Sequence, residues 1–340
     1  MEEIEDKYAI RKPKFDGLMT ALKFSLSQII VKKDISLFEL DGRVKTLDSI
    51  RNKMLRKSYM DPFDEIEDIC GLRIVCYYTS DMDAVAELIK EEFHVLEESD
   101  KQKEAEDDRF GYLSRHYIVK LKNEWLSAPL YTDYEGLKFE IQLRTMLMHT
   151  WAAISHKLLY KKESDAPREV KRRLNRLSAL IELADEQFNA IRQIKNEYIV
   201  KLESEEGDKN TPLNSDGLIL LVNKYSPGRI TKDDDIPEFL AEIESYNMTI
   251  SDFEDKIKLC LPYMEELEEK ILRAQGFGNL PVWTIAGYCR TVMDMTSDDY
   301  YSGRWGDTPS LQVEGDQNNF WNQWRHLIAE YNSKVRSSVH

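Results

Sequence analysis

The residues with the clearest chemical potential lie in the segment 139–145, read as FEIQLRT. Glu140, Gln142 and Arg144 alternate with apolar residues, so in a strand all three side chains would share one face. On one strand face, the carboxylate could bind a metal ion and the guanidinium could bind an anionic substrate. The alternative is an edge strand with a solvated polar face. This segment alone does not decide between the two.

A cluster of basic residues lies between residues 43 and 57. Its six cations are Arg43, Lys45, Arg51, Lys53, Arg56 and Lys57. Segment 46–56 has the apolar spacing of a helix, which places Ser49 and Lys53 one turn apart. Lysine and arginine usually lie on a solvated face. In a chain with 62 acidic and 47 basic residues, however, this density of cations favours a polyphosphate site.

A further carboxylate, Asp68, precedes the apolar run 72–78, which is typical of a buried central strand. Arg73 lies within that run, and a buried charge is costly unless it is paired or bound to a ligand. Segment 111–121 alternates as another strand and places Tyr112, Ser114 and His116 on one face.

Composition limits the class of protein. The net charge of −15 argues against non-specific nucleic-acid binding, which needs a basic surface. No run approaches the roughly 18 apolar residues of a membrane span, and the acidic start MEEIEDKYAI does not resemble a signal peptide. Four scattered cysteines form no CxxC pair, as expected of free thiols in a reducing compartment. We therefore expect a cytoplasmic protein without a membrane segment.

The elements that must position these residues alternate between strand and helix patterns. Strands are predicted at 35–40, 72–78, 93–99, 111–121 and 139–145, with a first helix at 14–33 and a loop from residue 97 to 109. This order predicts an α/β fold with a mixed five-stranded sheet flanked by helices. A long helix should follow from residue 167. The break at 205–217 then places a boundary between domains 1–205 and 206–340.

The second domain is predicted to be mainly helical. Its expected helices are 217–226, 236–246, 251–276 and 319–335, with a Gly- and Asp-rich loop at 298–317. Nothing in this part indicates an activity. A regulatory, partner-binding or oligomerising role, including a homo-oligomer, is the expectation.

Four segments together resemble the synthetase domain of the RelA/SpoT family, which makes the alarmones guanosine tetra- and pentaphosphate. They are GRVKTLDSIRNKM (42–54), EDICGLRIV (67–75), FGYLSRHYIV (110–119) and FEIQLRTMLMHTWAAISHKLLYK (139–161). The resemblance implies a nucleotidyltransferase-like fold. It also implies transfer of the β,γ-diphosphate of ATP to the ribose 3′-hydroxyl of GDP or GTP. The chain has no His-Asp dipeptide, so the family's hydrolase signature is absent and a synthetase alone is expected.

The resemblance also implies roles for the residues that bind ATP and metal. Asp68 would be a Mg2+ ligand, and Glu140 would assist the metal and act as general base toward the attacking hydroxyl. Arg43 and Arg73 would sandwich the adenine, since guanidinium planes stack on aromatic rings. Contacts to the ATP phosphates are implied for Lys45, Ser49 and Lys53.

The acceptor side is implied by another set of residues. Tyr112 matches the tyrosine that stacks on the acceptor guanine, and His116 matches a position near the acceptor phosphates. Gln142 and Arg144 belong to the matching strand, beside Glu140. The stretch KQKEAEDDRF (101–110) departs from the family pattern, because acids dilute the lysines expected to hold the acceptor's 5′-phosphates.

Two alternatives therefore stay open. One is a toxin-type synthetase that pyrophosphorylates the 3′ end of tRNA and so blocks translation. A basic patch could guide its acceptor stem, formed by Arg168, Lys171, Arg172, Arg173 and Arg176. The other is a non-catalytic nucleotide sensor that signals through the helical C-terminal part.

Overall fold

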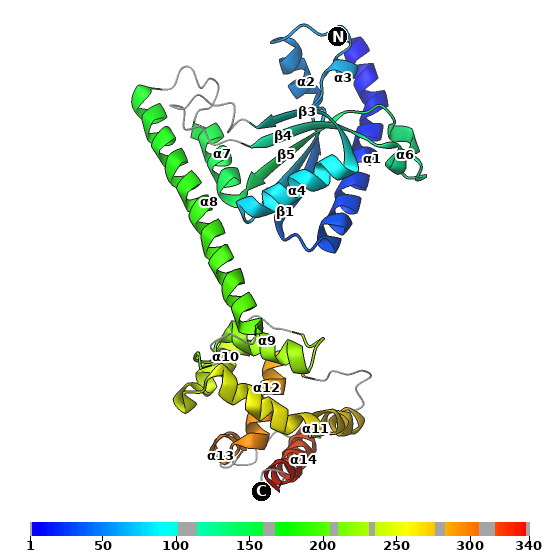
Figure 1. Ribbon diagram of the computed structural model, residues 1–340. Helices are drawn as coiled ribbons and strands as arrows, with labels where there is room; N and C mark the ends of the chain where they lie inside the picture. Colours follow the sequence, from blue (N-terminus) through cyan, green and yellow to red (C-terminus); the bar gives the residue numbers. More distant parts are fainter. Residues whose placement is uncertain are drawn as a thin grey trace. The chain divides into compact units, whose positions relative to one another are not determined.

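The computed structural model describes residues 2–100, 114–158, 167–204, 210–230, 235–275, 283–305 and 317–337 (Figure 1). The chain divides into two compact units, Met1–Gln193 and Ile194–His340, each with its own hydrophobic core. The division falls inside one long helix, α8 (Arg168–Glu203), whereas the sequence places the boundary after residue 205. Within the described ranges, no helix combines the length and the apolar character needed to cross a membrane.

Unit 1 contains the predicted mixed five-stranded sheet. Its strands are β1 (Leu37–Val44), β2 (Cys70–Cys76), β3 (Phe93–Asp100), β4 (Arg115–Leu121) and β5 (Phe139–Thr145). Their spatial order is β1-β2-β5-β4-β3, and β2 pairs with β5 in parallel while the other neighbours are antiparallel. The two parallel strands therefore lie at the centre.

One face of this sheet is apolar and forms the core of unit 1. The helices of the unit are α1 (Glu2–Lys32), α2 (Leu47–Met54), α3 (Pro62–Glu65), α4 (Thr79–Glu92), α6 (Asn123–Leu126), α7 (Met146–Leu158) and the first part of α8. Helices α1 and α4 pack against the sheet (Figure 1). Buried side chains from these helices and from the strands make one cluster, which includes Leu18, Leu22, Val85, Ile89, Leu72, Ile74, Ile141 and Leu143.

Several elements of unit 1 extend beyond their predicted limits. Strand β1 runs to Val44 instead of residue 40, and β2 begins at Cys70 instead of residue 72. Helix α1 begins at Glu2 and continues through Pro13, whereas the apolar pattern indicated a start at residue 14. Strand β3 runs to Asp100, so its end replaces the beginning of the loop expected from Glu97. Its polar residues pair with β4, with Glu98 opposite Tyr117. Pairing supplies backbone hydrogen bonds that local composition cannot indicate.

Unit 2 is helical in the residues described. After the end of α8 come α9 (Ser215–Tyr225), α10 (Asp235–Glu242), α11 (Ile250–Gln275), α12 (Ile285–Thr296), α13 (Asp298–Trp305) and α14 (Gln317–Ser337). Asn214 and Thr284 cap α9 and α12, because each side chain accepts a hydrogen bond from a first-turn amide. A buried bidentate ion pair joins Arg229 to Glu268 at 2.7 Å, and this guanidinium lies 4.3 Å from the ring centroid of Tyr288.

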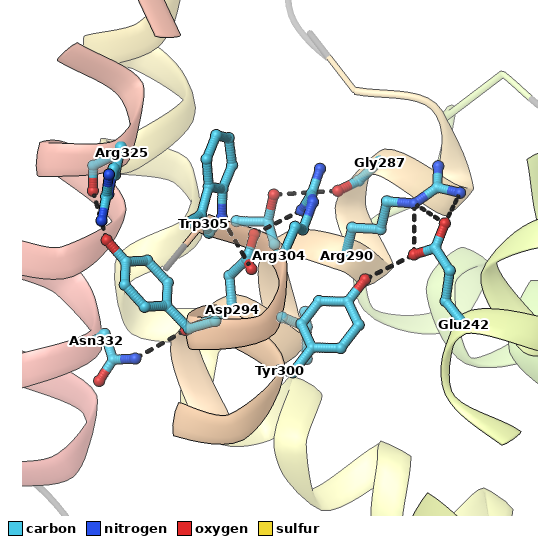
Figure 2. A network of polar contacts seen from close by, with 12 residues as sticks. Glu242, Gly287, Arg290, Asp294, Tyr300, Arg304, Trp305, Arg325 and Asn332 are labelled. Carbon is cyan, nitrogen blue, oxygen red and sulfur yellow. Dashed lines mark hydrogen bonds and ion pairs between the residues drawn. The ribbon is translucent and has the colours of Figure 1, made fainter. Parts of the chain in front are cut away.

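Helix α13 occupies residues 298–305 of the segment 298–317 that the sequence assigned to a loop. Residues 306–316 lie outside the described residues, and Gln317 begins α14. Tertiary hydrogen bonds hold it (Figure 2). Arg304 and Trp305 donate to the buried carboxylate of Asp294 at 2.6 and 3.1 Å. The hydroxyl of Tyr300 donates to Glu242 at 2.8 Å. These partners lie outside the segment, so its Gly- and Asp-rich composition did not indicate a helix.

This network predicts a pH dependence for the stability of unit 2. Burial raises the pKa of Asp294 to about 6, although Arg304 and Trp305 bind its ionised form. The folded state therefore holds a proton that the unfolded state has released, and stability falls as pH rises from about 4 to about 6. The contribution is on the order of 3 kcal/mol. Thermal unfolding of Asp294→Asn should show a shallower pH slope over this range than the wild type.

Asp255→Asn is the matched control, because Asp255 is an exposed acid of the same unit that pairs only with Lys258 among described residues. Its slope should equal that of the wild type. Equal slopes for the Asp294 variant and the wild type would refute this assignment.

Candidate functional site

The second face of the sheet is polar, and strand register arranges its side chains in rows. Arg43 of β1 lies opposite Gly71 of β2, which in turn lies opposite Glu140 of β5. The next row contains Asp41, Arg73, Gln142 and His116 from β1, β2, β5 and β4. Paired residues of neighbouring strands project to the same face. Residues more than 90 positions apart in the chain are therefore brought together.

A small cavity opens on this face. The residues that line it are Asp41, Gly42, Arg43, Lys45, Asp68, Gly71, Leu72, Arg73, Glu140 and Gln142. Six of the residues expected from the sequence to form the site are among them. Gly71 contributes to the opening, because a Cβ atom built at this position would meet no atom within 4 Å.

Asp68 is held by two lysines. It lies in the turn between α3 and β2. Lys53 Nζ donates to its Oδ1 at 2.8 Å and Lys45 Nζ to its Oδ2 at 3.0 Å. The backbone amide of Lys45 also donates to the carbonyl of Ile69 at 2.7 Å, which fixes the end of β1 beside this turn. Burial raises the pKa of Asp68, but the bonds from Lys53 and Lys45 outweigh it, so the pKa lies below its ordinary value.

Glu140 is also held by two donors. His116 Nδ1 lies 2.6 Å from Oε1, and Gln142 Nε2 donates to Oε2 at 2.8 Å. Burial raises the pKa of Glu140 and the charge of Asp68 acts in the same direction, yet the bonds from His116 and Gln142 bring it below its ordinary value. Both carboxyl groups are therefore ionised at neutral pH although each is partly withdrawn from water.

The two arginines of the site lie on neighbouring strands. Arg43 pairs with Gly71, so Arg73 is its diagonal neighbour, and diagonal side chains on antiparallel strands start about 7–8 Å apart. This spacing leaves room for a flat ring between two guanidinium planes. Asp41 faces Arg73 across the strands and accepts from Lys23 Nζ at 3.1 Å.

The structure does not bring all expected residues to the cavity. Lys53, His116 and Arg144 do not line it, but each hydrogen-bonds to a residue that does, Arg144 NH2 donating to Gln142 Oε1 at 3.1 Å. The hydroxyl of Ser49 is exposed and lies 2.9 Å from that of Thr46, the N-cap of its own helix. Tyr112 lies outside the described residues.

Two residues near the site were not assigned to it from the sequence. Ser114 is buried, and its hydroxyl lies 2.5 Å from His116 Nε2. The alternation that put Ser114 and His116 on one strand face was the available signal. His149 of α7 is the second: burial, followed by the charge of Arg73, lowers its pKa. Its Nδ1 atom is buried and finds no hydrogen-bond partner among the described residues.

The donor set fits a magnesium ion. Asp68 and Glu140 offer ionised oxygen ligands on the same cavity, and hard cations prefer such ligands. No group of three His, Cys, Asp or Glu side chains suited to a metal occurs in the described part of the chain. A small set of protein ligands suits Mg2+, which keeps several waters and binds substrate phosphates. The basic side chains beside these carboxylates would bind the phosphate groups of a polyphosphate substrate.

Comparison with known proteins agrees with this chemistry. Residues 42–165 match the family model described as a region found in RelA / SpoT proteins. GTP pyrophosphokinase YjbM of Bacillus subtilis (strain 168) is 38% identical over 156 residues, which cover 44% of this chain and 70% of the relative. GTP pyrophosphokinase YwaC of the same organism is 29% identical over 206 residues, covering 57% and 92%.

Among solved structures, the small alarmone synthetase 1 from Bacillus subtilis is 31% identical, with a TM-score of 0.48. The match covers 56% of this chain and 99% of that chain. The family match ends at residue 165, so unit 2 lies outside it. The family match and the identity to YjbM together show that this chain belongs to the RelA/SpoT family and is a pyrophosphotransferase.

Proposed function

We propose that this protein transfers the β,γ-diphosphate of ATP to the ribose 3′-hydroxyl of GDP or GTP. The observation that carries the proposal is the meeting of Asp68 and Glu140 with basic side chains on one cavity, in a chain whose curated relatives are named GTP pyrophosphokinases. The 3′-oxygen forms a bond to the β-phosphorus, the bond between the α- and β-phosphates breaks, and AMP leaves. The products from GDP and GTP are guanosine tetra- and pentaphosphate.

Asp68 and Glu140 are the proposed Mg2+ ligands. A bound Mg2+ would neutralise charge that spreads over the phosphate oxygens during transfer. Glu140 is also the proposed general base, because it is ionised and can take the proton of the 3′-hydroxyl. A carboxylate with a lowered pKa is a weak base, so its contribution lies mainly in orienting the hydroxyl and in accepting the proton as the new bond forms.

Lys45 and Lys53 are the proposed contacts to the ATP phosphates. In this structure both are counter-ions of Asp68. Both ammonium groups would contact the triphosphate in place of Asp68 when that carboxylate holds a metal ion. Ser49 lies one turn before Lys53 on α2 and would need to leave its contact with Thr46 to reach a phosphate. Arg43 and Arg73 would stack on the adenine.

The acceptor nucleotide is proposed to lie on the β5 and β4 side of Glu140. Gln142 and Arg144 extend the polar face there, His116 lies beside Glu140, and Tyr112 would stack on the guanine. This placement puts the acceptor hydroxyl between the base and the donor phosphates, as in-line attack requires.

A second candidate acceptor is the 3′ end of tRNA. One observation favours it: four basic side chains, those of Arg168, Lys171, Arg172 and Arg176, line a groove along the first half of α8. Such a groove could neutralise backbone phosphates of an acceptor stem.

The assay that separates these acceptors offers ATP labelled in its γ-phosphate together with GDP, GTP or tRNA in parallel reactions. Label should enter the guanosine nucleotides. Label that enters tRNA alone would select the second candidate, and label that enters none of the three would refute both.

Glu140→Gln should abolish transfer while leaving nucleotide binding. The amide keeps the shape of the side chain but can neither accept the proton nor neutralise the metal. We expect the rate to fall about 10²- to 10⁴-fold. Binding of a non-hydrolysable ATP analogue, measured by calorimetry, should persist. Glu135→Gln makes the same chemical change at an exposed residue and should keep full activity. A Glu140 variant as active as this control would exclude the proposed base.

Lys53→Gln should weaken ATP binding, because one charge-assisted contact to a phosphate is lost. Such contacts contribute about 1.5–3 kcal/mol, which corresponds to an affinity loss of about 10- to 100-fold. Lys57→Gln removes the same charge from an exposed neighbour and should change affinity little. Calorimetric titration with the ATP analogue measures both. Equal affinities for the two variants would show that Lys53 does not contact the phosphates.

A further inference from the structure

A directed chain of hydrogen bonds crosses the polar face from β4 to the far end of β5. Ser114 Oγ lies 2.5 Å from His116 Nε2, and His116 Nδ1 lies 2.6 Å from Glu140 Oε1. From the other side, Arg144 donates to Gln142, which donates to Glu140 Oε2 at 2.8 Å. Both halves of this hydrogen-bond chain therefore end on the carboxylate of Glu140.

The direction of each bond follows from the donors and acceptors present. An ionised carboxylate only accepts, so His116 Nδ1 must carry a proton toward Glu140. In the neutral imidazole the other nitrogen, Nε2, is then an acceptor. The hydroxyl of Ser114 has one hydrogen and lies within bonding distance of that nitrogen. Every donor group in this hydrogen-bond chain therefore points toward Glu140.

The same geometry leaves His116 no unbonded ring nitrogen. Nδ1 is taken by Glu140 and Nε2 by Ser114, and the histidine and glutamate side chains are only 16% and 15% exposed. A direct contact from this imidazole to an acceptor phosphate would require one of the two bonds to break. Glu140, in contrast, has two further lone pairs, because each carboxylate oxygen can accept more than one bond.

We propose that Ser114 is a positioning residue for this reaction, a role that rests on the function proposed above. Its hydroxyl bonds His116 Nε2 and so holds the imidazole ring in the orientation that aims Nδ1 at Glu140, and His116 in turn fixes the direction of the Glu140 carboxylate. His116 acts through Glu140 and not on the acceptor phosphates. Without the Ser114 hydroxyl, the ring is held on one side only, and its Nδ1–H is no longer fixed toward Glu140.

Partners that orient a metal ligand or a base typically change activity 10- to 100-fold when removed. We therefore expect kcat of Ser114→Ala to fall by about 10- to 100-fold. The KM values for ATP and the acceptor should stay unchanged, because Ser114 does not contact either nucleotide. Ser114→Thr keeps the hydroxyl and should restore kcat.

The control is Ser155→Ala. Ser155 is as buried as Ser114, each being 7% exposed, but its hydroxyl donates only to the carbonyl of Ala152 in its own helix among the described residues. This variant should retain both kcat and the KM values. Melting curves of all three variants verify that they are folded.

The direct readout is the nitrogen-15 NMR spectrum of the imidazoles in full-length protein labelled at its six histidines. His116→Gln identifies the signals of His116. Wild-type His116 should be protonated at Nδ1 and not at Nε2. Ser114→Ala should shift the Nε2 resonance, because this nitrogen loses its hydrogen bond, whereas Ser114→Thr and Ser155→Ala should match the wild type.

Two results would overturn the proposal: a wild-type His116 protonated at Nε2 alone, or a Ser114→Ala variant with an unchanged Nε2 resonance and unchanged kcat. A raised KM with constant kcat would also overturn it, by placing Ser114 in contact with a nucleotide. The NMR experiment needs no turnover. Failure of the proposed activity in the labelled-ATP assay is therefore distinguishable from failure of the assigned Ser114–His116–Glu140 contacts.

Discussion

The site depends on keeping two carboxylates ionised while both are partly removed from water. Burial alone would raise the pKa of Asp68 and of Glu140 and favour their neutral forms. The protein counters this with one donor for each oxygen: two lysines on Asp68, and a histidine and an amide on Glu140. Each carboxylate therefore keeps its charge, and each is also fixed in direction.

The central strands provide the rigid support for these groups. Because β2 and β5 are parallel neighbours with apolar side chains on one face, their polar side chains lie in register on the other. The antiparallel partners β1 and β4 extend the rows outward, so cations come from one side and His116 from the other. Gly71 leaves the middle of the first row open. The hydrophobic core and the site therefore lie on opposite faces of the same paired strands.

Unit 2 uses buried charge in another way. The Arg229–Glu268 pair is almost fully enclosed, and buried pairs of this kind contribute little net stability because both charges lose their hydration. They do restrict which helices can meet, since either charge left unpaired is costly. The Asp294 network places the same restriction on α13. Unit 2 therefore has a well-specified core of its own, outside the family match.

Local patterns in the sequence determined much of unit 1. The alternation in 139–145 put Glu140, Gln142 and Arg144 on one face, the apolar run after Asp68 marked a central strand, and helix spacing identified α2. These features depend on neighbours a few residues apart, so they can be read from the chain itself. The order of the four motifs along the sequence also indicated the family and, with it, the mixed sheet.

Only the tertiary structure decided how these groups are paired. The bonds of Lys45 and Lys53 to Asp68 and the chain from Ser114 to Glu140 join residues from different elements. Ser49 bonds to its own helix cap, although its spacing from Lys53 was all that the sequence indicated. Helix α13 forms where composition indicated a loop. In each case the deciding hydrogen bond depends on strand register or helix packing, which brings together donors and acceptors that no local pattern relates.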